Sequence, residues 1–408
     1  MTGNDCFDVV VVGGGPAGAT AAADLARAGR HVLLLDKAGR IKPCGGAIPP
    51  KLITDFAIPD SLLVAKVRSA RIVSPSAREA SMPVTEGGFV GMVDREHFDE
   101  WLRNRAALLG AERRAGTFER VERDEDGTTR VLYHPKGAPP DAPLEAVRTR
   151  AVIGADGANS AVARQCIPGA EQKRLVFAYH EIVRSPKDAP RAQFDGERAD
   201  VYYRGSLSPD FYAWIFPHGE TTSVGTGSAH KGFSLKGAVR ELREIAGLDR
   251  VETIRREGAP IPLKPLKRWD DGQNILLAGD AAGVVAPASG EGIYYAMLGG
   301  RFAAEAVNEF LATGKAAALA QARRRFMRLH GPVFWILGIM QDYWYGNDAR
   351  RERFVSICRD PDVQYLTWDA YMNKELVKAR PLAHVRIFFK NLAHLTGIVP
   401  AWSRARTA

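Results

Sequence analysis

Short apolar runs that end at glycine-rich turns recur along the chain, a pattern typical of parallel β-strands connected by helices. The first run, Phe7–Val12, is mostly β-branched and fits a central strand that is buried on both faces. The small residues of Ala19–Ala28 then predict a helix, and His31–Leu35 predicts a second strand that Asp36 closes. The N-terminal segment therefore predicts a βαβ unit.

A GxGxxG motif joins the first strand to the helix, with its glycines at Gly13, Gly15 and Gly18. The first glycine of such a motif permits a tight turn, and the second lets the backbone approach a pyrophosphate. The third, with alanines such as Ala17, lets helix and strand pack closely, and the helix N-terminus offers free N–H groups. Asp36 stands 18 residues after Gly18 and can accept hydrogen bonds from a ribose diol. The strand, glycine turn, helix, second strand and terminal acid together predict a dinucleotide-binding site, but they do not distinguish FAD from NAD.

Two later stretches repeat the pattern of an apolar strand that ends with Asp beside Gly. They are Ala151–Ser160 and Asn274–Gly283. The second is followed by Pro287 and by a Gly-Glu-Gly turn at 290–292, which opens a long helical run at Ile293. No second GxGxxG motif occurs in the sequence, so the sequence predicts no second Rossmann site for NAD(P)H.

A Cys-Gly-Gly sequence, Cys44 to Gly46, follows the second predicted strand. Two adjacent glycines suggest a backbone brought close to a planar ring. The alternative interpretation of Cys44 is a small buried hydrophobic residue.

The segment Pro209–Pro217 has the pattern PxxYxWxFP. Because side chains alternate in a strand, three aromatic residues share one face and three apolar residues share the other. The first set is Tyr212, Trp214 and Phe216, and the second is Phe211, Ala213 and Ile215. The first set predicts the floor of a long apolar tunnel, with ordinary core packing as the alternative. Pro217 to Gly219 predicts the turn into a return strand that starts at Thr221.

Charge is unevenly distributed along the 408 residues, whose net charge is +9. Residues 321–408 carry 15 Lys and Arg against 7 Asp and Glu, together with 13 of the 35 aromatic residues. This end of the chain predicts contact with an anionic partner, and the alternative is a solvated helical face. An anionic lipid surface is favoured over nucleic acid because no nucleic-acid-binding module is recognisable.

Cysteine spacing and hydropathy limit the class of protein. The four cysteines are far apart and form no CxxC pair, so neither a disulfide framework nor a metal site is expected. The start of the chain does not resemble a signal peptide, and the apolar patch Val333–Met340 is far shorter than the ~20 residues of a spanning helix. We therefore expect a cytoplasmic protein or one that touches a membrane only peripherally.

The order GxGxxG, then Gly-Ala-Asp-Gly, then Gly-Asp-Ala-Ala-Gly followed by Pro and Gly-Glu-Gly resembles the flavoprotein family of aromatic hydroxylases, squalene epoxidase and geranylgeranyl reductases. The Cys-Gly-Gly and PxxYxWxFP segments resemble the geranylgeranyl reductases. With them, four stretches of the tail resemble the (bacterio)chlorophyll branch rather than the archaeal lipid branch. These stretches are Tyr343–Asp348, Cys358–Gln364, Trp368–Lys374 and His384–Lys390.

The resemblance implies FAD as the cofactor, with NADPH as a transient reductant or another electron donor in its place. By that resemblance Asp280 would bond the ribityl chain, the Gly-Glu-Gly turn would lie beneath the isoalloxazine, and Arg95, which could also be a surface arginine, would lie near the phosphates. The complete set of cofactor contacts expected is Gly13, Gly15, Ala17, Gly18, Asp36, Lys37, Cys44, Gly45, Gly46, Arg95, Gly279, Asp280, Pro287, Gly290, Gly292 and Ile293.

The implied fold is an α/β protein. It combines a Rossmann-type FAD-binding domain, similar to that of aromatic hydroxylases, with an interleaved β-sheet substrate domain and a C-terminal helical region. The expected boundaries are 1–65, 93–165 and 265–330 for the FAD-binding domain, 66–92 and 166–264 for the substrate-binding domain, and 331–408 for the helical region.

The implied reaction is saturation of three C=C bonds of a geranylgeranyl chain to give phytyl, with the chain carried as diphosphate or esterified to (bacterio)chlorophyllide. Tyr212, Trp214 and Phe216 would contact the substrate, and Cys44 and Tyr212 are the candidate proton donors. No buried carboxylate–histidine pair is evident from the sequence. The alternatives are an FAD-dependent monooxygenase, an archaeol-type isoprenoid lipid reductase and a non-catalytic flavoprotein scaffold.

The substrate's insolubility suggests where the protein would act. A C20 isoprenoid stays in a bilayer until it is collected. Docking at the photosynthetic membrane is therefore expected, through the basic C-terminal region and in particular four arginines. They are Arg323, Arg324, Arg325 and Arg328.

Overall fold

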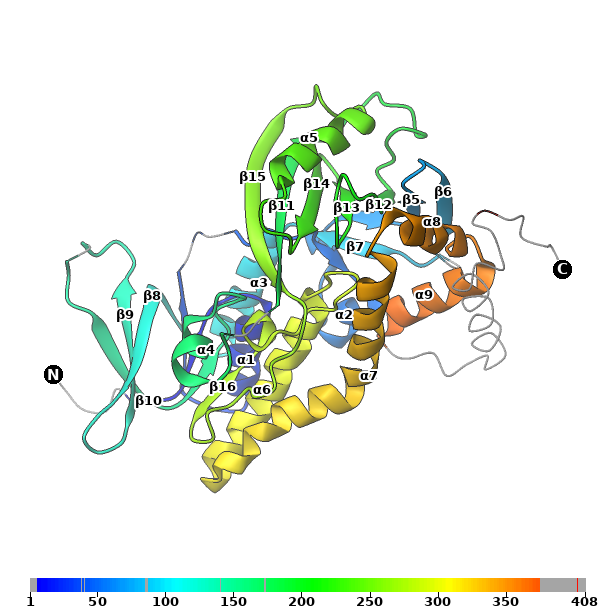
Figure 1. The fold of residues 1–408 in the computed structure, drawn as a ribbon. Helices are drawn as coiled ribbons and strands as arrows, with labels where there is room; N and C mark the ends of the chain where they lie inside the picture. Colours follow the sequence, from blue (N-terminus) through cyan, green and yellow to red (C-terminus); the bar gives the residue numbers. More distant parts are fainter. Residues whose placement is uncertain are drawn as a thin grey trace. The chain divides into compact units, whose positions relative to one another are not determined.

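The computed structural model (Figure 1) describes residues 6–37, 39, 41–84, 87–139, 141–171, 174–374 and 402. The chain divides into two units, and each is assembled from three separate segments. Unit 1 consists of Met1–Lys42, Arg95–Leu175 and Pro260–Phe334, and unit 2 consists of Pro43–Asp94, Val176–Ala259 and the chain from Trp335 onward.

Unit 1 is built on a six-stranded sheet. Its strands are β1 (Cys6–Val12), β2 (Val32–Asp36), β8 (Glu112–Arg123), β9 (Thr129–Pro135), β10 (Glu145–Gly154) and β16 (Ile275–Leu277). Strands β8, β2, β1, β10 and β16 lie side by side in that order and run parallel, while β9 pairs antiparallel with both β8 and β10. The predicted apolar strand is therefore β1, whose residues Val9, Val10, Val11 and Val12 are buried between two parallel neighbours.

The helices of unit 1 pack against this sheet or, for the last of them, against the long helix that precedes it. They are α1 (Pro16–Arg27), α3 (Arg95–Leu108), α4 (Ala161–Cys166), α6 (Ile293–Thr313) and the first part of α7 (Ala320–Trp344), with short 3-10 turns η2 (Gly279–Ala282) and η3 (Ala316–Ala318). Helices α1 and α6 approach each other backbone to backbone, because a side chain at Gly300 would lie 2.2 Å from the carbonyl oxygen of Ala17. This close packing holds the N-terminal ends of both helices against the same part of the sheet.

Unit 2 contains a seven-stranded sheet in the order β15-β11-β14-β13-β12-β5-β6 and a three-stranded sheet in the order β3-β7-β4. The strands are β3 (Ala47–Ile48), β4 (Leu63–Val67), β5 (Ser69–Val73), β6 (Glu79–Pro83), β7 (Val90–Val93), β11 (Leu175–Arg184), β12 (Arg198–Tyr202), β13 (Ala213–His218), β14 (Thr221–Ser228) and β15 (Thr253–Pro262). The helical elements are α2 (Pro50–Asp55), η1 (Asp60–Leu62), α5 (Leu235–Ile245), α8 (Asp348–Ile357), α9 (Pro361–Asn373) and the second part of α7.

The turn predicted at Pro217 to Gly219 is wrong. Pro217 pairs with Thr222 and His218 pairs with Thr221, so both residues belong to β13, and Gly219 and Glu220 form the turn. The physical reason is the left-handed backbone of Gly219, whose φ is +69°, a conformation that a two-residue hairpin turn requires and glycine readily adopts.

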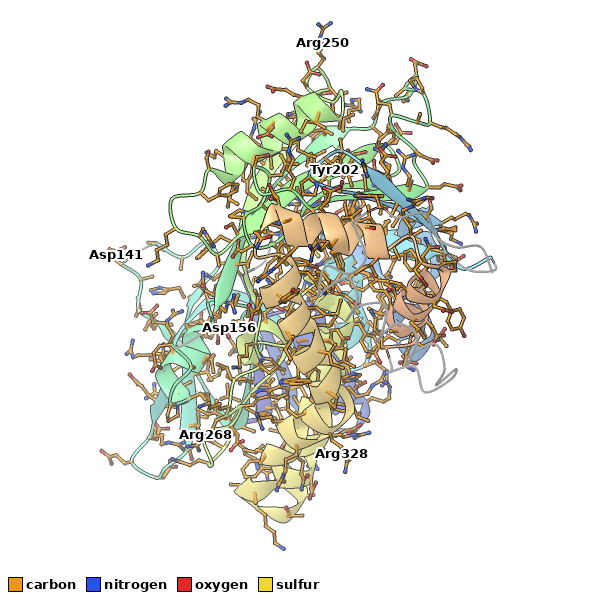
Figure 2. All side chains as sticks on the ribbon, turned by 45° about the vertical axis from the view of Figure 1, so that its right-hand side comes forward. Asp141, Asp156, Tyr202, Arg250, Arg268 and Arg328 are labelled. Atoms are coloured by element: carbon orange, nitrogen blue, oxygen red, sulfur yellow. The ribbon has the colours of Figure 1, made fainter. Side chains whose placement is uncertain are left out.

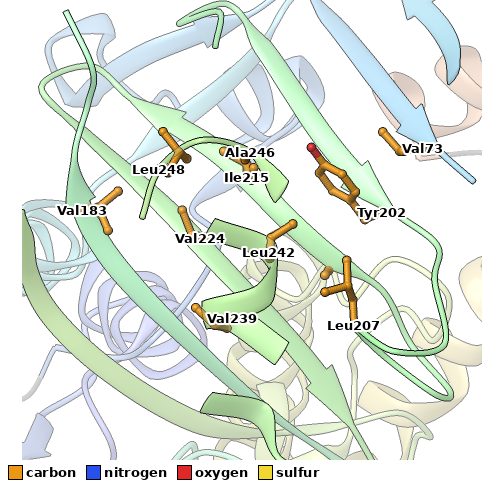
Figure 3. Close-up of a cluster of buried hydrophobic side chains, with 11 residues drawn as sticks. Val73, Val183, Tyr202, Leu207, Ile215, Val224, Val239, Leu242, Ala246 and Leu248 are labelled. Atoms are coloured by element: carbon orange, nitrogen blue, oxygen red, sulfur yellow. The ribbon is translucent and has the colours of Figure 1, made fainter. Parts of the chain in front are cut away.

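One face of the seven-stranded sheet packs against α5 (Figure 3). Ile215 of β13 and Val224 of β14 lie against Val239 and Leu242 of the helix. Ala213 belongs to the same cluster, so Ala213 and Ile215 do share a face, as predicted. Trp214 and Phe216 consequently belong to the opposite face of β13.

The observed units differ from the expected domains at one boundary above all. Residues 43–65 were expected in the FAD-binding domain, whereas the structure groups them with unit 2. The reason is that β3 and β4 pair with β7 in the three-stranded sheet, and β3 has only two residues, which is too short for a periodic signal. The tail from Trp335 also groups with unit 2, and its stretch His384–Lys390 lies outside the described residues.

Candidate functional site

The candidate cofactor residues of unit 1 gather at one edge of its sheet. Because β2, β1, β10 and β16 are parallel, their carboxyl ends meet at the same edge. The pairing register aligns Val12 with Leu35 and Gly154, and Gly154 with Leu277. The segments that follow these four residues therefore lie in a row, and they contain the GxGxxG motif, Asp36 and the Gly-Asp turn of η2.

Each of the three motif glycines is required for a different structural reason. Gly13 has φ of +104°, and a Cβ there would lie 2.4 Å from the carbonyl oxygen of Ala155. A Cβ on Gly18 would lie 1.8 Å from the carbonyl oxygen of Gly13, so α1 could not pack against the end of β1. Gly15 differs, because nothing lies within 4 Å of a Cβ at that position. The space above Gly15 is open to a ligand, as the motif predicts.

The N-terminus of α1 is suited to an anion. Gly15 is its N-cap, no side chain caps it, and its first turn carries no acidic residue. Its free N–H groups and the helix dipole therefore favour a phosphate group there.

Asp36 lies at the end of β2, beside the motif. Its Oδ2 accepts a hydrogen bond of 2.7 Å from the backbone N–H of Gly14, and Arg103 Nη1 lies 3.9 Å from its Oδ1. The carboxylate is thus held beside the glycine loop, in the position expected for binding a ribose. Lys37 follows it and is exposed. Arg103, which also donates to the carbonyl oxygen of Gly14 at 3.3 Å, is a site residue that the sequence analysis missed.

Asp280 is buried in η2 and forms an ion pair with Lys42. Gly279 before it has φ of +63°, and a Cβ there would lie 2.7 Å from Cβ of Ala17, so this turn packs directly on α1. The predicted Gly-Glu-Gly turn is also here, since a Cβ on Gly292 would lie 3.7 Å from Asp280 Oδ1. Lys42 was missed as a partner of Asp280, because 238 residues separate the two in sequence.

The segment that leads into α6 completes this group. Gly290 has φ of +66°, and Gly292 is the N-cap of α6, with no side-chain cap and no acidic residue in the first turn. Pro287 and Ile293 are buried. The helix therefore presents its N–H groups at the same edge as α1.

Two polar residues of the expected motifs are already engaged within unit 1. Asp156, labelled in Figure 2, follows β10 and caps α4: its carboxylate accepts from Ser160 Oγ at 2.5 Å and from the backbone N–H of Ala161 at 2.7 Å. Arg95 is 5% exposed and forms a bidentate pair with Asp99, with distances of 2.8 and 2.6 Å. The alternative of a surface arginine is therefore wrong for Arg95.

The residues of unit 1 fit a bound FAD. They provide an open position above a glycine, two uncapped helix N-termini at one sheet edge, and a carboxylate beside the glycine loop. These features suit, in that order, the close approach of a pyrophosphate, the binding of anionic groups and the binding of a ribose diol.

Cys44, Gly45 and Gly46 belong to unit 2, where β13 contacts them. A Cβ on Gly45 would lie 3.0 Å from the ring of Phe216, so the glycine backbone lies against an aromatic side chain. The expected contact of Gly45 and Gly46 with the cofactor stays a prediction. Gly46 has φ of +70° and donates its N–H to Cys44 Sγ at 3.4 Å. The structure thus brings together two motifs that lie about 170 residues apart in sequence.

His218 is a further residue that sequence analysis missed at this contact. Its Nε2 donates to the carbonyl oxygen of Gly45 at 3.1 Å. Burial lowers the pKa of His218 to about 4, against a smaller opposing effect of Asp94, so the imidazole is neutral near pH 7. Only its position two residues after Phe216, at the end of β13, could have suggested this role.

The aromatic residues of the PxxYxWxFP segment form a continuous row within unit 2. The ring centroids of Tyr212 and Trp214 are 5.9 Å apart, and those of Trp214 and Phe216 are 6.1 Å apart. The row ends at Gly45, which Phe216 contacts. Phe211 was expected on the opposite face, but its ring stacks on that of Tyr212 at 4.2 Å. The reason is that β13 begins only at Ala213, so strand alternation does not apply to Phe211.

A buried carboxylate–histidine pair exists, although none was evident from the sequence. His180 of β11 is 3% exposed, and its Nε2 lies 3.1 Å from Oε2 of Glu257 on β15. The two residues are 77 positions apart, and only the pairing of β11 with β15 brings them together.

Comparison with known proteins agrees with this geometry. Residues 66–326 match a family model described as FAD binding domain, and residues 8–59 match one described as FAD dependent oxidoreductase. Among solved structures, a geranylgeranyl bacteriochlorophyll reductase-like protein from Thermoplasma acidophilum has a TM-score of 0.78 and 22% identity, covering 94% of this chain and 99% of that protein. The expected fold class is therefore confirmed.

Two sequence relatives cover most of the chain. The chain is 59% identical over 394 residues to the geranylgeranyl diphosphate reductase of Rhodobacter capsulatus. The aligned region covers 97% of this chain and 98% of that protein. It is 33% identical over 325 residues to the digeranylgeranylglycerophospholipid reductase of Methanocaldococcus jannaschii, which covers 75% of this chain and 78% of that protein.

Proposed function

Because the chain belongs to the geranylgeranyl diphosphate reductase family of FAD-dependent oxidoreductases, we propose that it saturates three C=C bonds of a geranylgeranyl chain to give phytyl in (bacterio)chlorophyll biosynthesis. The structural observation that carries this proposal is the aromatic row of unit 2, Tyr212, Trp214 and Phe216, which ends at Gly45. A row of flat apolar rings suits a long isoprenoid chain and leaves its alkenes without polar competitors. The higher identity and fuller coverage of the Rhodobacter relative favour the pigment branch over the archaeal lipid branch.

Each saturation adds a hydride to one alkene carbon and a proton to the other. FAD held by the residues of unit 1 would supply the hydride once it is reduced, and NADPH would be the source of the two electrons for each saturation. The protein's own residues position the chain, exclude water and deliver the proton. Cys44, at the end of the aromatic row, and Tyr212, at its start, are the proposed proton donors.

Product analysis under anaerobic conditions tests this function. The purified protein with FAD and NADPH is offered geranylgeranyl diphosphate and geranylgeranyl-bacteriochlorophyllide side by side, with a digeranylgeranylglyceryl lipid in a third reaction. We expect mass spectrometry to show the addition of two, four and then six hydrogens to one or both of the first two substrates. Product that forms only in air, with an oxygen atom added, would instead identify a monooxygenase. Preferential reduction of the glyceryl lipid would identify an archaeol-type enzyme.

We also propose that the protein docks peripherally on an anionic membrane through α7. Among the described residues, no helix is long and apolar enough to cross a bilayer. Along α7, however, Trp335 is 68% exposed, and Leu329, Ile336 and Ile339 are exposed as well. Large apolar side chains on a helix surface, with tryptophan among them, suit the interfacial region of a bilayer.

The basic residues of this helix contribute unequally to the proposed docking. Arg323 donates to the carbonyl oxygen of Leu266 at 3.0 Å, and Arg325 pairs with Glu305, so both are engaged within unit 1. Arg324 is exposed and donates to the carbonyl oxygen of Ala317 at 3.3 Å, and Arg328, which is labelled in Figure 2, is exposed. The docking surface that we propose is formed by the exposed apolar residues Trp335, Ile336 and Ile339, which belong to unit 2. Arg324 and Arg328 of unit 1 are proposed as separate contacts with anionic lipid.

Vesicle co-sedimentation tests the docking surface. Serine at Trp335, Ile336 and Ile339 together should reduce binding to phosphatidylglycerol-containing vesicles about a hundredfold, because each of the three large apolar side chains that leaves water stabilises binding by ~1 kcal/mol or more. Leu108→Ser is the matched control, since Leu108 is an exposed apolar residue on α3. Equal binding of the triple variant and the wild type would overturn this surface.

A further inference from the structure

A chain of hydrogen bonds runs through unit 2 behind the central ring of the aromatic row. The indole Nε1–H of Trp214 donates to Ser223 Oγ at 3.0 Å. Ser223 Oγ lies 2.9 Å from His180 Nδ1, and His180 Nε2 lies 3.1 Å from Glu257 Oε2. Arg255 lies 2.5 Å from the other oxygen of that carboxylate, so the chain ends in an ion pair.

Two states of the His180 ring satisfy all three hydrogen bonds: a doubly protonated ring would donate to both Ser223 and Glu257, and the neutral ring satisfies them as follows. An ionised carboxylate can only accept, so His180 Nε2 carries the proton and donates it to Glu257. Nδ1 of the neutral ring is then an acceptor for the Ser223 hydroxyl, and the oxygen of that hydroxyl remains free to accept from the indole of Trp214. With the neutral ring, all donors point from Trp214 toward Glu257, and in both states the orientation of each group depends on the next.

The indole of Trp214 packs directly against the backbone of the neighbouring strand β14, which restricts its position. Trp214 pairs with Gly225 of β14, and Gly225 pairs with His180 of β11. A Cβ on Gly225 would lie 2.3 Å from Cζ2 of Trp214 and 2.6 Å from Cβ of His180, so the indole lies directly on the glycine backbone. Ser223 is fully buried and Trp214 is 6% exposed, so water cannot replace these hydrogen bonds.

We infer that Ser223, His180 and Glu257 are positioning residues that fix the orientation of the Trp214 indole and, through it, the register of the isoprenoid chain along the aromatic row. This inference rests on the proposed function. Reduction of successive alkenes requires the chain to occupy several defined registers, and a freely turning ring in the middle of the row would not define them. If these hydrogen bonds are broken, we expect incomplete reduction of the isoprenoid rather than loss of the cofactor.

A double-mutant cycle tests whether Ser223 acts through the indole. Ser223→Ala should lower kcat/KM for the geranylgeranyl substrate roughly tenfold and release partly reduced chains, because a misplaced alkene reacts slowly. Trp214→Phe has no Nε1–H, so adding Ser223→Ala to it should change kcat/KM by less than about twofold. An equal tenfold loss in both backgrounds would show that Ser223 acts without the indole and would overturn the inference.

Variants of Glu257 test the hydrogen bond between His180 and Glu257. Glu257→Gln keeps an oxygen acceptor for His180 Nε2 and should release fewer partly reduced chains than Glu257→Leu, which removes that acceptor. Ser185→Ala is the matched control: it deletes a hydroxyl that bonds Thr222 Oγ1 at 2.8 Å in the same sheet but away from Trp214, and it should leave the products unchanged. Identical product mixtures from the two Glu257 variants would contradict a role for the carboxylate.

NMR of the tryptophan indoles tests the orientation of Trp214 without relying on enzymatic activity. With indole ¹⁵N-labelling, each of the seven tryptophans gives one Nε1–H signal, and that of Trp214 is identified by its absence from Trp214→Phe. The signal should shift in Ser223→Ala and stay in place in Ser185→Ala. An unmoved signal in Ser223→Ala would overturn the inference. If the wild type reduces no geranylgeranyl chain while the signal shifts as expected, the proposed function fails and the positioning of the indole stands.

Discussion

Alanine at position 15 is expected to weaken FAD binding about a hundredfold while the cofactor-free protein unfolds at the wild-type temperature. Gly15 has an ordinary backbone conformation, with φ of −74° and ψ of −175°, and nothing lies within 4 Å of an added Cβ. The protein itself can therefore accept the methyl group. A pyrophosphate that approaches the N-terminus of α1 cannot, and a hundredfold loss corresponds to about 2.7 kcal/mol.

Gly18→Ala is the contrasting variant. Its Cβ would lie 1.8 Å from the carbonyl oxygen of Gly13, so it should lower both FAD binding and the thermal stability of the cofactor-free protein. Flavin fluorescence titration measures the affinity, and circular dichroism measures the unfolding temperature without FAD. Wild-type affinity in Gly15→Ala would mean that the cofactor does not approach this glycine. A lowered melting temperature in Gly15→Ala would mean that the effect is one of folding.

Alanine at position 225 is expected to lower reduction of the geranylgeranyl chain at least a hundredfold while the protein retains its FAD. The added Cβ would lie 2.3 Å from Cζ2 and 2.6 Å from Cε2 of Trp214. The indole of Trp214 is rigid and cannot bend away, so it must leave its position against the backbone of Gly225. A displaced ring interrupts the aromatic row, and misplacement of reacting groups by about 1 Å can lower a rate a hundredfold.

Steady-state kinetics and flavin absorbance measure the two outcomes for Gly225→Ala. Overpacking typically destabilises a fold by ~1–3 kcal/mol, so the unfolding temperature of the variant, measured by circular dichroism, must show that unit 2 as well as unit 1 has folded. The matched control is Gly196→Ala, because nothing lies within 4 Å of a Cβ at that position in the same unit. Full activity of Gly225→Ala would exclude a role for the orientation of Trp214 in the reaction, and a comparable loss in Gly196→Ala would point to a nonspecific effect.

The order of the cofactor motifs was predictable because each motif is local. A run of β-branched residues, a GxGxxG turn and an acid at the end of the next strand lie within 31 residues, from Cys6 to Asp36, and the structure contains all of them. The helix predicted to start at Ile293 is likewise present as α6. Backbone geometry set by neighbouring residues was sufficient for these predictions.

Long-range partners were not predictable, because no local pattern encodes them. The ion pair of Lys42 with Asp280 joins residues 238 positions apart, and the contact of Gly45 with Phe216 joins two motifs whose relation the sequence did not show. The assignment of residues 43–65 to unit 2 depends on a two-residue strand that has no periodic signal.

The dinucleotide-binding βαβ unit and the alternating faces of β13 follow from steric rules that act over a few residues, so both could be predicted from residue order alone. What lies behind β13 depends on the pairing of distant strands and could not be predicted. His180, Ser223 and Glu257 come from three strands, and sheet pairing alone brings their polar atoms within hydrogen-bonding distance of one another. Buried polar groups must find partners wherever the fold places them, and that requirement acts across the whole chain rather than along it.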